Sequence, residues 1–206
     1  MAEGRLLTIT VGVTGASGAI LAQKALQLLE ADARVGRVHL VVTETGMRLF
    51  AEELGIMPGD FALLPGATRK IKVLSNKDVG ASIASGSHEV DAMVVIPCSM
   101  GTLGAIAAGV SDDLVSRAAD VMLKEGRKLI LCVRDTPFNR IHLENMLRAQ
   151  SAGAVIMPAV PAFYHHPKTI DDLVTQYVCR VLAQMNLPQE EMYRWEGSLA
   201  AKKADA

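Results

Sequence analysis

Two turns rich in glycine and hydroxyl residues carry the clearest chemical signals in the sequence. The first reads Gly12-Val13-Thr14-Gly15-Ala16-Ser17-Gly18 and joins an apolar run to a helical pattern. Free N–H groups at such a helix start can bind a phosphate. The second, Pro97-Cys98-Ser99-Met100-Gly101-Thr102, has the same setting and adds hydroxyl groups. Both turns follow predicted strands, and together they favour a mononucleotide or flavin held where the strand order of a sheet reverses.

A dinucleotide site and a structural role are the competing interpretations of these turns. The first turn has the spacing G-x-x-G-x-x-G, whereas the usual dinucleotide motif is G-x-G-x-x-G. Glu44, at the end of the second predicted strand, is nevertheless placed like the acid that binds an adenosine ribose. Tyr164 and Lys168 have the spacing of some dehydrogenases, but Pro167 between them prevents a shared helical face. Ser99 is equally suited to an ordinary helix N-cap.

Basic residues at several points predict one cationic pocket, although the formal net charge is only -1. Arg117 and Lys124 lie two turns apart along the same face of a predicted helix, a pattern that is also typical of a solvated face. Arg134 follows a predicted strand, where its guanidinium can bind a phosphate through two hydrogen bonds. Arg180 on the final helix and Tyr164 after the last strand complete the set.

The elements that must position these residues alternate along the chain. The 206 residues, half of them hydrophobic, suit one domain over 1–206, with 198–206 as a flexible tail and 55–68 as a loop. Strands that are almost wholly apolar, separated by helices, indicate an α/β fold with a doubly wound parallel sheet. The predicted strands are 6–13, 38–43, 70–74, 92–97, 129–133 and 154–157. The predicted helices are 18–31, 46–54, 141–149 and three that begin at the caps Ser99, Ser111 and Thr169.

Composition and charge exclude several classes of protein. A balanced charge gives no overall field for holding nucleic acid or an anionic membrane, and no apolar run approaches the length of a membrane span. The three cysteines are far apart, which argues against a disulfide framework, and Cys98 is expected to be a core thiol. The histidines lack partners at metal-ligand spacing, so no metal is predicted. Glu52 and Glu53 are typical of a helix surface, and the N-terminus suggests a cytoplasmic protein without a signal peptide.

Taken together, the turns resemble those of the UbiX-type flavin prenyltransferases, formerly called aromatic acid decarboxylase subunits. The resemblance covers about residues 7–197 and is least distinctive over 55–80. It rests on the segments 14–19 (TGASGA), 84–87 (ASGS), 96–103 (IPCSMGTL), 117–121 (RAADV) with Lys124-Glu125, 136–137 (TP), 141–147 (IHLENML), 153–156 (GAVI), 161–165 (PAFYH) and 171–174 (DDLV).

The resemblance implies a flavodoxin-like, Rossmann-like α/β fold in a large homo-oligomer, typically a dodecamer. It implies an enzyme that moves a dimethylallyl group from dimethylallyl phosphate, or the diphosphate, onto N5 and C6 of reduced FMN. The product, prenylated FMN, would serve UbiD-type decarboxylases, and no metal would be needed.

The resemblance also implies roles for individual residues. It assigns proton movement at flavin N5 to Ser17 and Glu53, and places the flavin phosphate at the turn 15–17. The residues implied to meet FMN are Gly15, Ala16, Ser17, Thr43, Ser99, Met100, Gly101, Thr102 and Arg134. Those implied to hold the prenyl phosphate are Arg117, Lys124, Tyr164 and Arg180, helped by Arg134 and Asp135, and of these Lys124 and Asp135 are counted as catalytic.

The chain departs from the family pattern at four positions. Asp135 stands where a glutamate is usual, and Thr43 replaces a serine. Val79 lies where many members carry an aromatic residue, and His88 follows the ASGS segment unexpectedly. Two other activities compete with prenyl transfer. One is an FMN-dependent cysteine decarboxylase, whose Pro-x-Ser-x-x-Thr turn is similar but which has no leaving phosphate to hold; the other is a non-catalytic FMN carrier.

Overall fold

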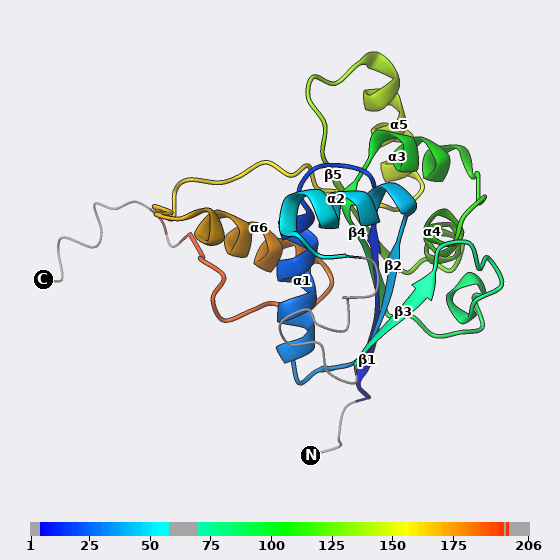
Figure 1. The fold of residues 1–206 in the computed structure, drawn as a ribbon, viewed down its shortest axis with the longest axis horizontal. Helices are drawn as coiled ribbons and strands as arrows, with labels where there is room; N and C mark the ends of the chain where they lie inside the picture. The colour runs from blue at the N-terminus through cyan, green and yellow to red at the C-terminus, as the bar shows by residue number, and fades with distance from the viewer. Residues whose placement is uncertain (1–4, 58–69, 196, 198–206) are drawn as a thin grey trace, which may run out of the picture.

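The computed structural model describes residues 5–57, 70–195 and 197 and contains a six-stranded parallel sheet with helices on both faces (Figure 1). The strand order β3-β2-β1-β4-β5-β6 reverses direction between β1 and β4, so the doubly wound α/β prediction is confirmed. The strands are β1 (Leu7–Val13), β2 (Val35–Val42), β3 (Ile71–Ser75), β4 (Ala92–Cys98), β5 (Lys128–Val133) and β6 (Val155–Ile156).

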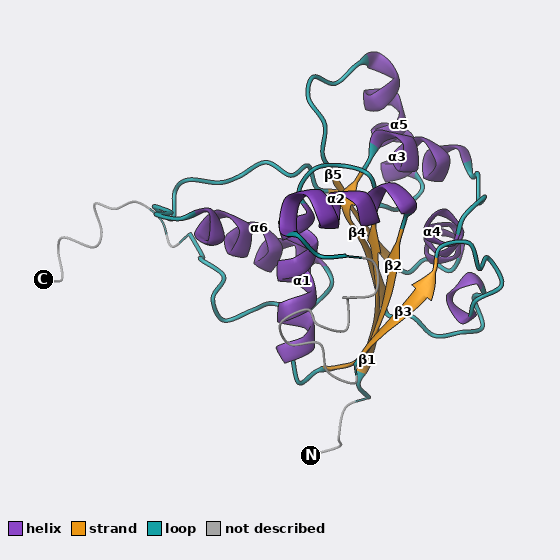
Figure 2. Cartoon of the chain, viewed as in Figure 1, coloured by secondary structure: helices purple, strands orange, loops and turns teal. Residues whose placement is uncertain are grey.

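Helices cover both faces of the sheet (Figure 2). Two hydrophobic clusters, one on each face, hold these layers together. On one face pack α1 (Ala19–Ala31), α2 (Glu44–Leu54) and α6 (Ile170–Gln184). On the other pack α3 (Met100–Ala108), α4 (Leu114–Lys124), α5 (Arg140–Ser151) and the short η2 (Ser82–Ala84). Successive strand residues point to opposite faces, so Val94 joins the α1–α6 cluster and Val95 the α4 cluster.

Most predicted elements are present, with shifted ends. The N-cap of α4 is Asp113 and not Ser111: its carboxylate accepts from the Ser116 N–H at 2.8 Å, and the Ser116 hydroxyl accepts from the Asp113 N–H at 3.3 Å in a reciprocal capping box. Ser99 and Thr169 cap α3 and α6 as predicted. Most of the expected loop 55–68 and the expected tail 198–206 lie outside the described residues.

The three cysteines are buried and unpaired. Burial raises the pKa of each thiol, to about 12 for Cys132 and about 11 for Cys179, and further still for Cys98. Cys98 is thus the core thiol that the sequence predicts. Among the described residues, no helix combines the length and the apolar character that crossing a membrane requires.

Candidate active site

The two glycine and hydroxyl turns meet at the carboxyl edge of the sheet, next to the point where the strand order reverses. Thr14 joins them, because its hydroxyl donates to the Pro97 carbonyl at 2.9 Å and accepts from the Ser99 N–H at 2.8 Å. The Thr43 N–H donates to the Val13 carbonyl at 2.9 Å. The Arg134 N–H donates to the Cys98 carbonyl at 3.1 Å. Four segments far apart in the sequence therefore converge here, as a ligand site in this fold requires.

Glu53 occupies the start of α1, where the sequence predicts a phosphate. Its carboxylate accepts from the Gly18 N–H at 3.0 Å and the Ala19 N–H at 2.8 Å, and Ser17 donates a third hydrogen bond. Glu53 is exposed, as its helical context suggests, but its carboxylate is bound to the start of α1. The Gly18 and Ala19 N–H groups thus already bind an anion, and the placement of the flavin phosphate at 15–17 stays a prediction.

The protonation of Glu53 follows from these contacts. Partial burial of the carboxylate alone would raise its pKa. The hydrogen bonds from Ser17, Gly18 and Ala19, together with the positive charge of Arg134, outweigh burial and hold the pKa below its ordinary value. At neutral pH Glu53 is thus an ionised acceptor that orients the Ser17 hydroxyl.

Glycine at position 15 is required by a close approach between two turns. A Cβ added to Gly15 would lie 2.4 Å from the Thr45 hydroxyl oxygen, at the start of α2. Gly18 adopts a φ of 119°, which side-chain-bearing residues rarely adopt. The tight turn thus brings Ser17 within reach of Glu53, and Ala16 is buried beneath it.

The second turn borders open space on its ligand side. The Ser99 hydroxyl lies 3.1 Å from the Thr102 hydroxyl and accepts from the Thr102 N–H at 3.3 Å. A Cβ added to Gly101 would have no neighbour within 4 Å. The Nε of Arg134 is buried and, within the described ranges, has no hydrogen-bond partner. A buried donor of this kind is costly unless a ligand accepts from it, so the edge fits a polar, anionic molecule such as FMN.

Tyr164 and Arg180 form a second centre at the side of α6. The Arg180 guanidinium donates to the Tyr164 hydroxyl at 3.1 Å. Arg180 also lines a cavity of about 290 Å³ between α6 and the segment that follows β6. The Tyr164 ring packs against Tyr193, with centroids 5.5 Å apart, and against Trp195 at 6.2 Å. The sequence alone does not place Tyr193 or Trp195 at the site.

Arg117 and Lys124 lie on the opposite face of the sheet from Tyr164 and Arg180. Both belong to α4, whose apolar side packs in one core cluster, while α6 packs in the other (Figure 1). Lys124 also ends α4, and the chain then enters β5 at the amino edge of the sheet. A pocket that holds all four residues therefore does not form within one chain, because the sheet separates the two pairs.

The two α4 residues already have partners within the chain. Arg117 donates to the Ala84 carbonyl at 3.2 Å and to the Asp120 carboxylate at 2.9 Å, so it fixes the loop that carries the ASGS segment. Lys124 forms an ion pair with its neighbour Glu125. A Cβ added to Gly86 would collide with the Glu125 carboxylate and lie 2.8 Å from the Lys124 ammonium nitrogen. The loop thus approaches the ion pair closely, and a side chain at position 86 would require the Glu125 and Lys124 side chains to move.

Three further positions that the sequence singles out are Asp135, Val79 and His88. Asp135 follows β5 and accepts from the Thr136 N–H at 2.8 Å. Val79 is half-exposed. His88, unexplained by the sequence, packs its ring edge-on against the buried ring of His39, with centroids 5.5 Å apart. In the part of the chain that the structure describes, no three His, Cys, Asp or Glu side chains come together as a metal site would require.

Sequence comparison gives this chain clear relatives. Residues 2–182 match the family model described as Flavoprotein. The chain is 45% identical over 192 residues to the flavin prenyltransferase UbiX of Halalkalibacterium halodurans, with 90% of this chain and 92% of that protein covered. It is 43% identical over 197 residues to the flavin prenyltransferase UbiX of Escherichia coli K12, with 92% and 98% covered.

Solved structures give the same grouping. The crystal structure of AnUbiX (PadA1) in complex with FMN and dimethylallyl pyrophosphate is 43% identical, with a TM-score of 0.87 over 94% of this chain and 100% of that chain. A dodecameric FMN-dependent UbiX-like decarboxylase from Escherichia coli O157:H7 is 44% identical, with a TM-score of 0.86 over 93% and 100%. The cysteine decarboxylase TvaF, at 17% identity and a TM-score of 0.56, is similar in fold alone.

Proposed function

The chain belongs to the Flavoprotein family, among its UbiX-type flavin prenyltransferases, and on this premise we propose that it transfers a dimethylallyl group to reduced FMN. The C–O bond of the donor would break as flavin N5 bonds to the allylic carbon, and the phosphate would leave with the electron pair. Flavin C6 would then bond to the far alkene carbon while the other alkene carbon takes up a proton, and N5 and C6 would each lose one proton as the fourth ring closes. The observation in this structure that carries the proposal is the convergence of Ser17, Glu53 and the buried Nε of Arg134 at one edge of the sheet.

The residues at this edge fit FMN. Arg134 offers a buried N–H that needs an acceptor, and the turn at Gly101 leaves room for the flavin. Thr43 and Ser99 place hydroxyl groups on either side of the first turn. Reduced FMN, as the acceptor substrate, supplies the nucleophilic N5 and C6 positions.

Glu53 and Ser17 form the proton-handling pair of the proposal. Because the Glu53 carboxylate is ionised and hydrogen-bonded to Ser17, it can hold or accept a proton through that hydroxyl. Its attachment to the N–H groups of Gly18 and Ala19 fixes its position, so no rotation is needed before the proton moves.

The prenyl phosphate site is proposed to form between two copies of the chain. Lys124 and Arg117 on α4 of one copy would face Tyr164 and Arg180 beside α6 of another, with Asp135 near the second pair. Each cation then stabilises the negative charge that develops on the leaving phosphate. The separation of the two pairs on opposite faces of the sheet supports a homo-oligomer, and a dodecamer is the assembly named for one similar structure.

Three further points stay predictions. The donor is dimethylallyl phosphate or its diphosphate, the prenylated flavin passes to a UbiD-type decarboxylase, and the reaction takes place in the cytoplasm.

Product mass measurement tests the function directly. The protein is incubated anaerobically with reduced FMN and dimethylallyl phosphate, and the flavin is analysed by mass spectrometry. A flavin enlarged by one five-carbon group is the expected product. An unchanged flavin would leave the carrier and the decarboxylase. Release of carbon dioxide from an added peptide with a C-terminal cysteine would then indicate the decarboxylase, and its absence the carrier. A calorimetric titration in which the protein binds NAD and not FMN would contradict the flavin assignment altogether.

A further inference from the structure

The segment that follows α6 returns along the molecule and is fastened at both ends; we call residues 186–195 the C-terminal strap. Near its start, Leu187 is buried in the core. The Arg34 guanidinium donates to the Pro188 carbonyl at 2.9 Å. The Gln189 amide donates to the Asp32 carboxylate at 3.0 Å. These contacts attach the first half of the strap to the turn between α1 and β2.

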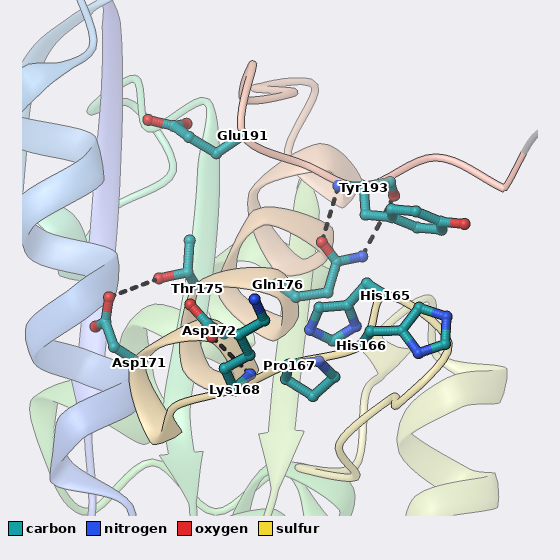
Figure 3. A pocket seen from close by; sticks show the side chains of 10 residues that line it. All are labelled: His165, His166, Pro167, Lys168, Asp171, Asp172, Thr175, Gln176, Glu191 and Tyr193. Atoms are coloured by element: carbon teal, nitrogen blue, oxygen red, sulfur yellow. Dashed lines mark hydrogen bonds between the residues drawn. The ribbon is translucent and has the colours of Figure 1, made fainter.

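Gln176 fastens the second half of the strap to α6. Its side-chain oxygen accepts from the Tyr193 N–H at 2.9 Å, and its side-chain nitrogen donates to the Tyr193 carbonyl at 3.3 Å. Figure 3 shows both hydrogen bonds reaching from the helix to the main chain of the strap. The Gln176 side chain is buried, with the residue only 4% exposed, so its amide has exchanged water for these two bonds.

The strap places Tyr193 against the phosphate-binding pair. The Tyr193 ring packs on Tyr164 with centroids 5.5 Å apart, and Trp195 meets the same ring edge-on at 6.2 Å. Tyr164 in turn accepts a hydrogen bond from Arg180, one turn after Gln176 on the same helix. A continuous chain of contacts thus runs from Gln176 through Tyr193 and Tyr164 to Arg180.

We propose that Gln176 is a positioning residue for the prenyl donor, which acts by holding Tyr193 so that the Tyr164 hydroxyl stays aligned with Arg180. The proposal rests on the proposed function. A buried apolar side chain of similar size could fill the same space, but it could not fix the strap in register. An amide can do so because it accepts from one main-chain group and donates to another of the same residue. Gln176 also borders the cavity lined by Arg180, so its position affects both partners of the pair.

The test compares Gln176→Met with Gln184→Met, a matched change at an exposed position of the same helix. We expect Gln176→Met to raise the KM for dimethylallyl phosphate about five- to tenfold, in line with the loss of one or two hydrogen bonds. The transfer rate at saturating donor and the affinity for FMN should change less than about twofold, because neither Ser17 nor Arg134 touches the strap. Gln184→Met should behave as the parent does.

Two further measurements exclude a general loss of structure. Trp195 is the only tryptophan in the sequence, so acrylamide quenching of its fluorescence reports on the strap. Quenching should increase in Gln176→Met and not in Gln184→Met. In Gln176→Glu, the protonated carboxyl can both donate and accept, as the amide does. The ratio of the donor KM of this variant to that of the parent should therefore fall towards one as the pH falls. No such recovery is expected for methionine.

Tyr193→Leu tests the same path if Gln176→Met does not fold. It keeps the main-chain hydrogen bonds and removes the ring on Tyr164, and it should raise the donor KM by a similar factor. The role of Gln176 would be overturned if a folded variant showed increased quenching of Trp195 but kept the parent KM for the donor. It would also be overturned if the variant lost affinity for FMN by the same factor as for the donor. Measuring the unmodified protein first separates the two proposals, because absence of prenyl transfer by the parent would overturn the function itself.

Discussion

Subunit complementation tests the arrangement in which the sheet separates Lys124 from Arg180. Lys124→Ala and Arg180→Ala should each slow prenyl transfer at least tenfold, because a charged hydrogen bond to phosphate contributes about 1.5–3 kcal/mol. If each site takes Lys124 from one copy and Arg180 from another, an equal mixture of the two variants contains intact sites. Random assembly makes about a quarter of them intact, since each of the two contributions is correct half the time.

The assay uses co-expressed variants that carry different affinity tags, so that only mixed oligomers are purified. Single-turnover flavin absorbance with reduced FMN and saturating dimethylallyl phosphate then gives the fraction of active sites. A matched control mixes the parent with a chain that carries both substitutions. Sites shared between copies should again give about a quarter of the parent activity, whereas sites within one chain should give about half.

Two results would refute this reasoning. Mixed single variants that stay as inactive as each variant alone would mean that one chain supplies both residues. Parent-like rates in each single variant would mean that Lys124 and Arg180 are solvated charges without a phosphate to bind. A loss of FMN affinity in either variant would instead assign that residue to the flavin.

Three other substitutions test separate parts of the structure. Burial, followed by the charges of His88, Arg37 and Lys72, lowers the pKa of His39 to about 4 from 6.5. Between these two pH values the unfolded chain binds more protons than the folded protein. The free energy of unfolding therefore falls by up to about 3 kcal/mol as the pH drops from 6.5 to 4. Urea unfolding at pH 7 and pH 5 should show this loss reduced in His39→Leu, and an equal loss in both proteins would contradict it. Glu53→Gln should slow transfer at least about tenfold with FMN still bound, because the amide cannot take the proton from Ser17; stopped-flow absorbance at parent speed would remove Glu53 from the mechanism. Asp113→Ala should lower the free energy of unfolding by about 1 kcal/mol through loss of the α4 N-cap, without changing the donor KM, and an unchanged denaturation midpoint would count against the cap.

Most strands could be predicted because a parallel strand that is buried on both faces is a run of apolar residues, whereas the edge strand β3 (IKVLS) gives a weaker signal. The helix starts at Ser99 and Thr169 could be predicted because a cap depends on a few neighbouring residues. The α4 cap shows the limit of that reasoning. Ser111 and Asp113 are both good N-caps by type, and only the reciprocal bonding of Asp113 with Ser116 decides between them.

The arrangement of the site residues was harder to predict from the sequence, because it depends on packing between distant segments. Nothing near Glu53 in the sequence indicates that α2 directs its carboxylate to the start of α1. The opposite placement of Lys124 and Arg180 depends on the strand order, which a single sequence does not state. Gln176 lies two residues from both Val174 and Val178, so it points away from the apolar stripe of α6, and its burial could not be predicted from its neighbours in the sequence.

The buried thiols bear on how the protein withstands its own chemistry. Free reduced flavins react with oxygen and release peroxide, which oxidises cysteine through the thiolate. With the pKa of Cys179 raised to about 11, its thiolate is scarce at neutral pH, and the pKa values of Cys98 and Cys132 are raised further. Lack of solvent access protects all three further. A protein that handles a reduced flavin in air thus keeps its most oxidisable atoms in a form and a place that peroxide attacks slowly.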